Sequence, residues 1–243
     1  MNVRIYLLGT GTAIPLRRGL PCIVLKINSH LYVFDIGEGC QQRLINMGLS
    51  PIKIKSIFIT HAHGDHSLGL FGLLQSMHLM DMKNPLNIVV PREIYVLLEE
   101  MIEMKLVKPG FTINPSIVRE GDVYSDDNVK VYAFPVKHSI PAYGYLAIVK
   151  DKYRIVYTGD TMYCEDVVKH SQGAHLLIHE ATFASIDQDK AREEKHSTAV
   201  DAAIAASKAG VKTLVLTHIS PRYNDTSILY YDAYRYFKNT IVA

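Results

Sequence analysis

The segment with the clearest chemical potential is residues 60–66, Thr-His-Ala-His-Gly-Asp-His, which follows an apolar run. It places three histidines and one carboxylate where a buried strand is predicted to give way to a turn. Neutral imidazole and carboxylate are the ligands that zinc and similar ions prefer. His61 and His63 alternate on the extended segment, whereas Asp65 and His66 begin the next element and point elsewhere. The pattern predicts two metal ions, with a solvated histidine-rich turn as the simpler alternative.

Four more metal-type residues stand directly after predicted strands: Asp35, His138, Asp160 and His218. Strand ends on one edge of an α/β sheet are where ligand sites collect. A single residue of this kind usually forms a turn or a cap, but four of them beside the first motif favour ligands. Asp35 is the exception, because its sequence Asp-Ile-Gly-Glu-Gly fits better a turn that orients a ligand from behind.

Composition describes an ordinary globular protein. With 243 residues and 48% hydrophobic content, the chain can bury a sizeable core. No linker, repeat or low-complexity tract divides it, so we expect one α/β domain over residues 1–243. The net charge is only +2, so the composition does not indicate a nucleic-acid binder. Any site for a polyanion must come from local clustering of cations.

Cysteine usage and the N-terminus bear on the compartment. Cys22, Cys40 and Cys164 are an odd number, lie far apart and lack Cys-x-x-Cys spacing, so a disulfide framework is not expected and a reducing compartment is favoured. The N-terminus enters a strand-like run without the features of a signal peptide. No apolar stretch approaches the length that spans a bilayer. We therefore expect a cytoplasmic protein with no membrane partner.

Short apolar runs alternate with helical patterns along the chain. The predicted strands are residues 3–8, 22–27, 31–34, 57–60, 86–90, 129–135, 145–149, 155–158, 176–179 and 214–217. The predicted helices are residues 41–47, 68–80, 92–104, 197–209 and 227–237. Ser197 fits the N-cap of its helix, and Gly210 fits the left-handed residue that commonly ends one.

With these motifs in hand, the chain resembles the metallo-β-lactamase superfamily and, within it, is similar to the ribonuclease Z family, endonucleases that trim tRNA 3′ ends. The resemblance covers nearly the whole length. Its motifs are GTGTAIP at 9–15, FDIGEG at 34–39, the 60–66 motif with GLFGLL at 69–74, KHSIPAYGY at 137–145, YTGDT at 157–161 and THISPRY at 217–223. HEAT at 179–182 and HST at 196–198 are more specific to ribonuclease Z.

The resemblance implies an αββα sandwich with two metal ions at one edge of the sheets, and a homodimer. It assigns ligands as follows: His61, His63 and His138 to the first metal, Asp65, His66 and His218 to the second, and Asp160 as a bridge between both. Zinc is the expected metal, and manganese or iron suits the same nitrogen and oxygen ligands.

The implied chemistry is phosphodiester hydrolysis, in which two metals supply a nucleophile near neutral pH and neutralise the phosphate. Asp65 is doubly placed, as a ligand and as the group that orients the attacking hydroxide or accepts its proton. By resemblance, His196 protonates the departing 3′-oxygen and Glu180 holds it, since a carboxylate keeps an imidazole protonated. The simpler alternative is that Glu180 and His196 only tie a loop to a strand. His179 is expected to lie behind the ligands.

Three residues are weaker candidates for contacts to substrate: Thr10, Arg18 and Arg222. Surface arginines usually just solvate a face. Arg222 is the best of the three, because its turn also carries the candidate ligand His218.

One departure from the family bears on the substrate. Ribonuclease Z inserts a long flexible arm, which grips tRNA, between the counterparts of His138 and Asp160. Here only 21 residues separate them, and the predicted strands 145–149 and 155–158 occupy most of that space. RNA 3′ ends, tRNA precursors above all, are the leading substrate class. Small phosphodiesters such as cyclic nucleotides or activated esters are the alternative. A non-catalytic partner subunit is a third possibility, although a scaffold needs none of these ligands.

Overall fold

The computed structural model describes residues 2–243, and the chain forms two compact units, residues 1–118 and 119–243. Met1, the first residue of the expected domain, lies outside the described residues. The expectation of one domain over 1–243 stays a prediction. None of the helices within residues 2–243 combines the length and the hydrophobicity that a membrane span requires.

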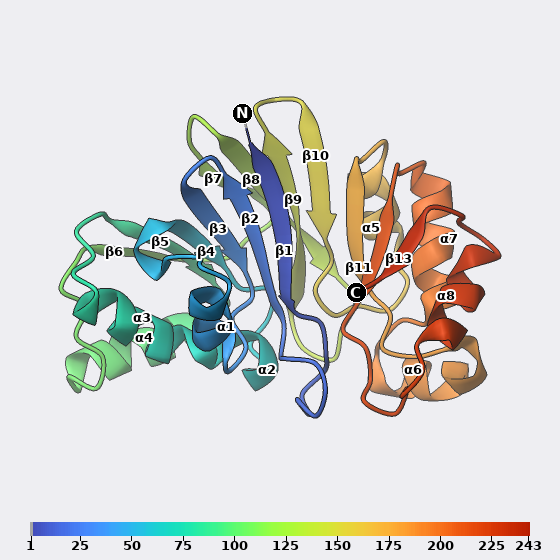
Figure 1. Cartoon of the computed structure of the whole chain (residues 1–243), viewed down its shortest axis with the longest axis horizontal. Helices are drawn as coiled ribbons and strands as arrows, with labels where there is room; N and C mark the ends of the chain where they lie inside the picture. Colours follow the sequence, from blue (N-terminus) through green and yellow to red (C-terminus); the bar gives the residue numbers. More distant parts are fainter. Residues whose placement is uncertain (1) are drawn as a thin grey trace. The chain divides into compact units, whose positions relative to one another are not determined.

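The first unit is a mixed sheet with helices beside it (Figure 1). Its strands run in the order β1-β2-β3-β4-β5-β6, with antiparallel pairing from β1 to β3 and parallel pairing from β3 to β6. The strands are β1 (Val3–Gly9), β2 (Cys22–Ile27), β3 (His30–Phe34), β4 (Ile54–Phe58), β5 (Leu86–Val90) and β6 (Ile113–Ile117). The helices are α1 (Cys40–Asn46), α2 (Gly64–Ser67), α3 (Gly69–Leu79) and α4 (Arg92–Glu103), with a 3-10 turn η1 (Pro51–Lys53).

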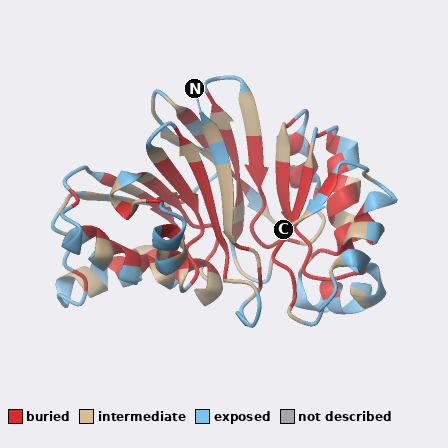
Figure 2. Cartoon of the chain, viewed as in Figure 1, coloured by how far each residue is buried: buried red, intermediate tan, exposed pale blue. Residues whose placement is uncertain are grey.

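Apolar side chains from the sheet and from α1, α3 and α4 make the core of this unit. Leu44, Leu73 and Leu98 are fully buried against strand residues such as Val33 and Ile57. Figure 2 shows strands β2 to β5 largely buried and the outer sides of the helices exposed. The sequence did not predict β6, because its proline and polar residues do not read as a strand. Its place at the end of the sheet, paired only with β5, tolerates that proline.

The second unit also consists of a mixed sheet and helices. Its strands run in the order β13-β12-β11-β10-β9-β8-β7, antiparallel from β7 to β10 and parallel from β10 to β13. The strands are β7 (Gly121–Ser125), β8 (Val129–Val136), β9 (Ala142–Val149), β10 (Tyr153–Tyr157), β11 (Leu176–Glu180), β12 (Leu214–Thr217) and β13 (Thr240–Val242). The helices are α5 (Glu165–Ser171), α6 (Gln188–Glu194), α7 (Ala199–Ala209) and α8 (Ser227–Tyr234), with a 3-10 turn η2 (Ser185–Asp187).

Helix α7 begins one residue later than its sequence suggests. The N-cap is Thr198, whose hydroxyl accepts a hydrogen bond from the Asp201 backbone N–H at 3.1 Å, while the Asp201 carboxylate accepts one from the Thr198 N–H at 2.9 Å. The assignment of the cap to Ser197 is therefore wrong, because this reciprocal pair satisfies two end donors that Ser197 alone does not reach. Ser197 instead donates to the Thr161 carbonyl at 2.6 Å. Gly210 ends the helix at φ 62°, as predicted.

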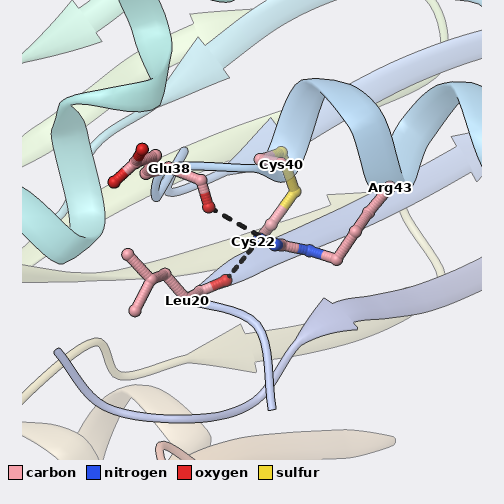
Figure 3. The surroundings of a disulfide bond; sticks show 5 residues. All are labelled: Leu20, Cys22, Glu38, Cys40 and Arg43. Carbon is pink, nitrogen blue, oxygen red and sulfur yellow. Dashed lines mark hydrogen bonds between the residues drawn. A yellow bond between two sulfur atoms is a disulfide. The ribbon is translucent and has the colours of Figure 1, made fainter. Parts of the chain in front are cut away.

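The expectation of no disulfide is wrong, because Cys22 and Cys40 are bonded and only Cys164 is free. They are 18 positions apart in sequence, but Cys22 opens β2, Cys40 opens α1, and their Cα atoms are 5.9 Å apart. The spacing of Cys22 and Cys40 along the sequence did not indicate that they lie close together in the fold. Arg43 connects the segments on either side of this disulfide, because its guanidinium donates hydrogen bonds to the carbonyls of Leu20 at 2.9 Å and Glu38 at 3.3 Å (Figure 3).

A close backbone approach fixes the turn after β3. The Gly69 N–H donates to the Ile36 carbonyl at 2.9 Å, and a Cβ on Gly69 would lie only 2.4 Å from the Gly37 carbonyl oxygen. Glycine therefore lets α3 begin directly against this turn. The Ile36 N–H also donates to the His66 carbonyl at 2.7 Å, so the turn is tied to the histidine motif itself.

Candidate metal-binding sites

In the first unit, Asp35 organises the histidine motif from the end of β3. Its carboxylate accepts hydrogen bonds from the Thr60 backbone N–H at 2.8 Å, the Thr60 hydroxyl at 3.0 Å and His66 Nδ1 at 2.7 Å. Parallel pairing of β3 with β4 brings these strand ends to one edge. Asp35 is fully buried and adopts a left-handed φ of 57°, a conformation that costs energy and is typical of functional sites. The orienting role of Asp35 stays a prediction, which these contacts support.

The candidate ligands of this unit lie close together. His61 Nδ1 lies 2.9 Å from the Thr60 hydroxyl, and His61 Nε2 lies 3.0 Å from His63 Nδ1. His66 Nε2 lies 3.6 Å from Asp65 Oδ2. Two ligands about 2.0–2.1 Å from one tetrahedral ion are separated by roughly 3.3 Å. These two donor pairs therefore have the chemistry and the spacing of metal ligands.

In the second unit, three candidate ligands follow three different strands. His138 comes after β8, Asp160 after β10 and His218 after β12. Asp160 Oδ2 lies 3.4 Å from His218 Nε2 and 3.9 Å from His138 Nε2. Both imidazoles thus turn the same nitrogen toward one buried carboxylate, which brings three donor atoms of the metal-binding type together.

The other nitrogen of each imidazole is held by the protein. His218 Nδ1 donates to the Thr182 hydroxyl at 2.8 Å, and His138 Nδ1 donates to the Lys195 carbonyl at 3.0 Å. Such contacts fix the ring orientation and the tautomer of metal-binding histidines. His218 and Lys195 have left-handed φ angles of 56° and 62°, so the backbone is strained at one partner of each contact.

Glu180 and His196 form a largely buried ion pair beside these candidate ligands. Glu180, at the end of β11, is fully buried, and its Oε1 lies 2.7 Å from His196 Nδ1. The same carboxylate accepts hydrogen bonds from the Thr161 N–H at 2.8 Å and the Thr182 hydroxyl at 2.7 Å. His196 Nδ1 is also 3.9 Å from Asp160 Oδ2.

Burial favours the neutral forms of both partners, but their mutual attraction outweighs it. For His196, burial works against the charged ring, while the charge and hydrogen bond of Glu180 and the charge of Asp160 raise its pKa to about 9. For Glu180, burial works against the carboxylate, while His196 lowers its pKa. His196 is therefore an imidazolium at neutral pH and can donate a proton.

The two units share a pattern of three linked groups. In the first, the Thr60 hydroxyl lies between His61 Nδ1 and the buried carboxylate of Asp35. In the second, the Thr182 hydroxyl lies between His218 Nδ1 and the buried carboxylate of Glu180. Sequence reasoning missed the role of Thr182, although it belongs to the HEAT segment, and the role of the Lys195 carbonyl, which no side chain signals.

The remaining predicted residues take varied positions. His179 is fully buried, and its Nδ1 donates to the Glu180 carbonyl at 2.7 Å. The Arg222 guanidinium lies 4.7 Å from the Phe183 ring centre and 3.6 Å from Asp187. Thr10 and Arg18 are half-buried on the segment between β1 and β2.

Comparisons with known proteins agree with this geometry. The beta-lactamase superfamily domain matches residues 33–219. The ribonuclease Z of Methanothermobacter thermautotrophicus is 36% identical over 289 aligned positions, which cover 99% of this chain and 94% of the relative. The crystal structure of human tRNase Z, short form, matches with a TM-score of 0.83 and 33% identity, over 90% of this chain and 93% of that chain. YhfI from Bacillus subtilis, a metallo-beta-lactamase fold protein, shares the fold with a TM-score of 0.87 at 18% identity, over 99% of this chain and 95% of that chain.

This chain and its Methanothermobacter relative differ in length. The alignment with the Methanothermobacter protein spans 289 positions, more than the 243 residues of this chain, so that relative has segments that this chain lacks. Residues 139–159 are all described, and β9 and β10 fill most of them. No room remains there for a long arm. The chain nevertheless belongs to the metallo-β-lactamase superfamily and, within it, to the ribonuclease Z family of metal-dependent hydrolases.

Proposed function

We propose that this protein cleaves RNA endonucleolytically at the 3′ end of tRNA precursors. The observation that carries the proposal is the Glu180–His196 pair beside candidate metal ligands, in a chain whose similarity to ribonuclease Z extends over nearly both full lengths. A protein that only bound a partner would need neither a buried ion pair of this kind nor imidazoles oriented by Asp35 and Thr182.

As the resemblance to ribonuclease Z implies, the candidate ligands would hold two divalent ions, and their donor chemistry fits this role. The assignment is His61, His63 and His138 to one ion, Asp65, His66 and His218 to the other, and Asp160 to both. Nitrogen and carboxylate donors suit zinc, and manganese or iron is a chemically reasonable substitute. When bound, two such ions lower the pKa of an attacking water molecule and neutralise phosphate charge.

The chain's own residues would perform the proton transfers. Asp65, with one carboxylate oxygen 3.6 Å from His66 Nε2, orients the attacking water and accepts its proton. On the leaving side, His196 donates a proton to the departing 3′-oxygen. Glu180 holds His196 in place and stabilises its charged form, which keeps the ring protonated between turnovers. A positioned general acid typically contributes about 10²–10⁴-fold to the rate.

Small phosphodiesters are the alternative substrate class, and the short connection between His138 and Asp160 favours this alternative. It consists of β9, a turn and β10, with no long arm to hold the body of a tRNA. The same ligands and the same acid would serve either substrate. The two functions therefore differ only in which groups outside the metal site contact the rest of the molecule.

Assembly and location follow from the proposed substrate and the family. We propose a homodimer, as the resemblance to ribonuclease Z implies, and a cytoplasmic protein, because tRNA precursors are made inside the cell. The Cys22–Cys40 disulfide is unusual for such a location. Arg222 is the best candidate for a further phosphate contact, because it is held beside Phe183 on the turn that carries His218.

The experiment that tests the proposal is cleavage of a tRNA precursor with a 3′ trailer by zinc-loaded protein, beside bis(p-nitrophenyl) phosphate. We expect one cut at the trailer junction, which leaves a 3′-hydroxyl on the tRNA and a 5′-phosphate on the trailer. Hydrolysis of the small diester without any cut in the RNA would replace the proposal with the small-diester function. Activity on neither substrate would reject both.

A further inference from the structure

A pocket of about 340 Å³ lies entirely within the second unit, and His196 forms part of its wall. The rest of the wall includes Tyr163, which follows β10, Arg192 of α6, and Ile204 and Lys208 of α7. This volume lies at the lower end of the range for small-molecule sites, and therefore suits one small organic group rather than several. None of the metal ligands assigned above lines it.

His196 links the pocket to the ligands of the second unit. Its ring centre lies 5.0 Å from that of His138 and 5.4 Å from that of His218. Its Nδ1 is engaged by Glu180, so Nε2 is the nitrogen through which it would donate a proton to a substrate. A group that receives this proton must therefore lie at the boundary between the ligands and the pocket.

The pocket wall has a cationic side. Among the side chains that line the pocket, Arg192 and Lys208 provide two positive charges against the one carboxylate of Asp201, and Lys208 also pairs with the exposed Glu165 at 3.3 Å. The only ion pair of Arg192 that the described residues show is with Asp189, at 3.9 Å, and both side chains are well exposed, so the attraction is weak. The guanidinium is therefore placed to exchange this partner for a phosphate, which it matches in geometry.

The apolar part of the pocket wall is formed by the ring of Tyr163 and the aliphatic side chain of Ile204. Lys208 Nζ donates to the Tyr163 hydroxyl at 2.7 Å, and that hydroxyl donates to Glu165 at 2.8 Å. These contacts hold the Tyr163 ring in one position. Together with Ile204, the ring provides a fixed apolar surface next to cations. Aromatic surface beside positive charge is the combination that binds single-stranded nucleic acid through its bases and phosphates.

We propose that this pocket binds the nucleoside that carries the departing 3′-oxygen, the last nucleotide of the RNA product. The inference rests on the proposed function, because it takes His196 as the acid that protonates this oxygen. In an in-line displacement, the attacking and leaving oxygens lie on opposite sides of phosphorus. The sugar and base attached to the leaving oxygen therefore extend past His196 into the pocket.

Arg192 and Lys208 then meet the phosphate on the 5′ side of this nucleoside, where the RNA chain leaves the pocket. The base contacts Tyr163 and Ile204. A small diester with no base and no second phosphate would use none of these contacts. The pocket thus gives the enzyme a means to prefer RNA without an arm between His138 and Asp160.

The test compares two tRNA precursors, one intact and one with an abasic ribose at the nucleotide 5′ of the cut. Wild-type protein should cleave the abasic RNA at least tenfold more slowly, measured as kcat/KM. Ile204→Trp, which fills the pocket, should slow cleavage of the intact RNA about tenfold and leave cleavage of the abasic RNA near the wild-type rate. Arg192→Gln should raise KM for the intact RNA several-fold. Lys190→Gln is the matched control, since Lys190 lies on α6, pairs with Glu194 at 3.5 Å and does not line the pocket.

Equal slowing of both RNAs by Ile204→Trp would overturn the inference, as would equal effects of the substitutions at Arg192 and Lys190. If the tryptophan variant does not fold, the Arg192 and Lys190 pair still decides the matter. Failure of the proposed function looks different, because wild-type protein would then hydrolyse bis(p-nitrophenyl) phosphate and leave both RNAs uncut.

Discussion

In the first unit the four candidate ligands lie within six residues, whereas in the second unit three candidate ligands come from strand ends up to 80 positions apart. Each unit nevertheless links a candidate ligand to a buried carboxylate through a threonine hydroxyl. In the first unit, that carboxylate, Asp35, also holds His66, a second candidate ligand. In the second unit, Glu180 instead holds His196, which we propose as a proton donor.

The difference shows that a buried carboxylate beside an imidazole can serve either metal binding or proton donation. A carboxylate behind a metal-bound imidazole orients it and strengthens it as a ligand. A carboxylate behind an imidazole that binds no metal stabilises its protonated form and makes it an acid. Substitutions at Asp35 should therefore change metal affinity, while substitutions at His196 should change the rate and leave the metal in place.

The largest expected effect is that of His196→Ala. Loss of a positioned acid should lower kcat on the tRNA precursor by about 10²–10⁴-fold. Metal content, measured by elemental analysis of the dialysed protein, should stay at the wild-type value. Equal rates with and without this histidine would reduce the Glu180–His196 pair to a structural tie, and loss of metal would make His196 a ligand.

The Cys22–Cys40 disulfide lies in the first unit and should stabilise the folded protein. A cross-link that closes a loop of this size contributes about 3 kcal/mol, more than a hundredfold in the unfolding equilibrium. Reductant should therefore lower the stability of the wild-type protein to urea and leave a Cys22→Ala, Cys40→Ala double variant unchanged. Thiol titration in denaturant should find one thiol, Cys164, before reduction and three after it. Three thiols without reductant would contradict the bond.

Asp35→Asn should weaken metal binding about 10–100-fold, the range for outer-shell partners of metal ligands. Asparagine tolerates the left-handed φ of 57° at this position, so the effect reports the lost charge rather than backbone strain. Competition with a chromophoric chelator measures the affinity.

Thr182→Val tests the hydroxyl that supports a candidate ligand of the second unit, between His218 and Glu180. It removes a neutral hydroxyl behind His218, so we expect about a tenfold loss of metal affinity, at the lower end of the same range. If the valine variant weakens metal binding more than Asp35→Asn, the carboxylate is not the stronger support and the contrast between the units fails.

The smallest effect lies away from the ligands, at His170. Its ring stacks against Phe134 at 4.6 Å and Tyr132 at 5.2 Å between ring centres, and burial lowers its pKa. The unfolded chain takes up this proton near pH 6.5 and the folded chain only at lower pH, so the contribution to stability is complete above 6.5 and falls as pH falls toward the folded pKa. Urea unfolding at pH 7.5 and 5.5 should show a smaller loss for His170→Phe than for wild type. An identical loss would contradict this.

Much of the first unit's site could be predicted because its information is local. Residues 60–66 contain the ligand types, the strand that precedes them and the turn that separates them. Asp35 could be predicted as a support because it ends a neighbouring strand. The positions of His138, Asp160 and His218 at strand ends were also predictable, since each follows an apolar run.

The rest depends on contacts between distant parts of the chain. Nothing in the sequence pairs Thr182 with His218, or the Lys195 carbonyl with His138, because these contacts follow from the positions of β11, β12 and the end of α6. The Cys22–Cys40 bond escaped prediction for the same reason. A hydroxyl and a carbonyl are also too common in any sequence to signal a role by type.

The central claim is that the protein binds two metal ions, one that depends on His61 and one that depends on His218. Native mass spectrometry of zinc-loaded protein tests it most directly, by counting ions per chain in the wild type, His61→Ala and His218→Ala. We predict two ions for the wild type and one for each variant. One ion in the wild type, or two in both variants, would contradict the account.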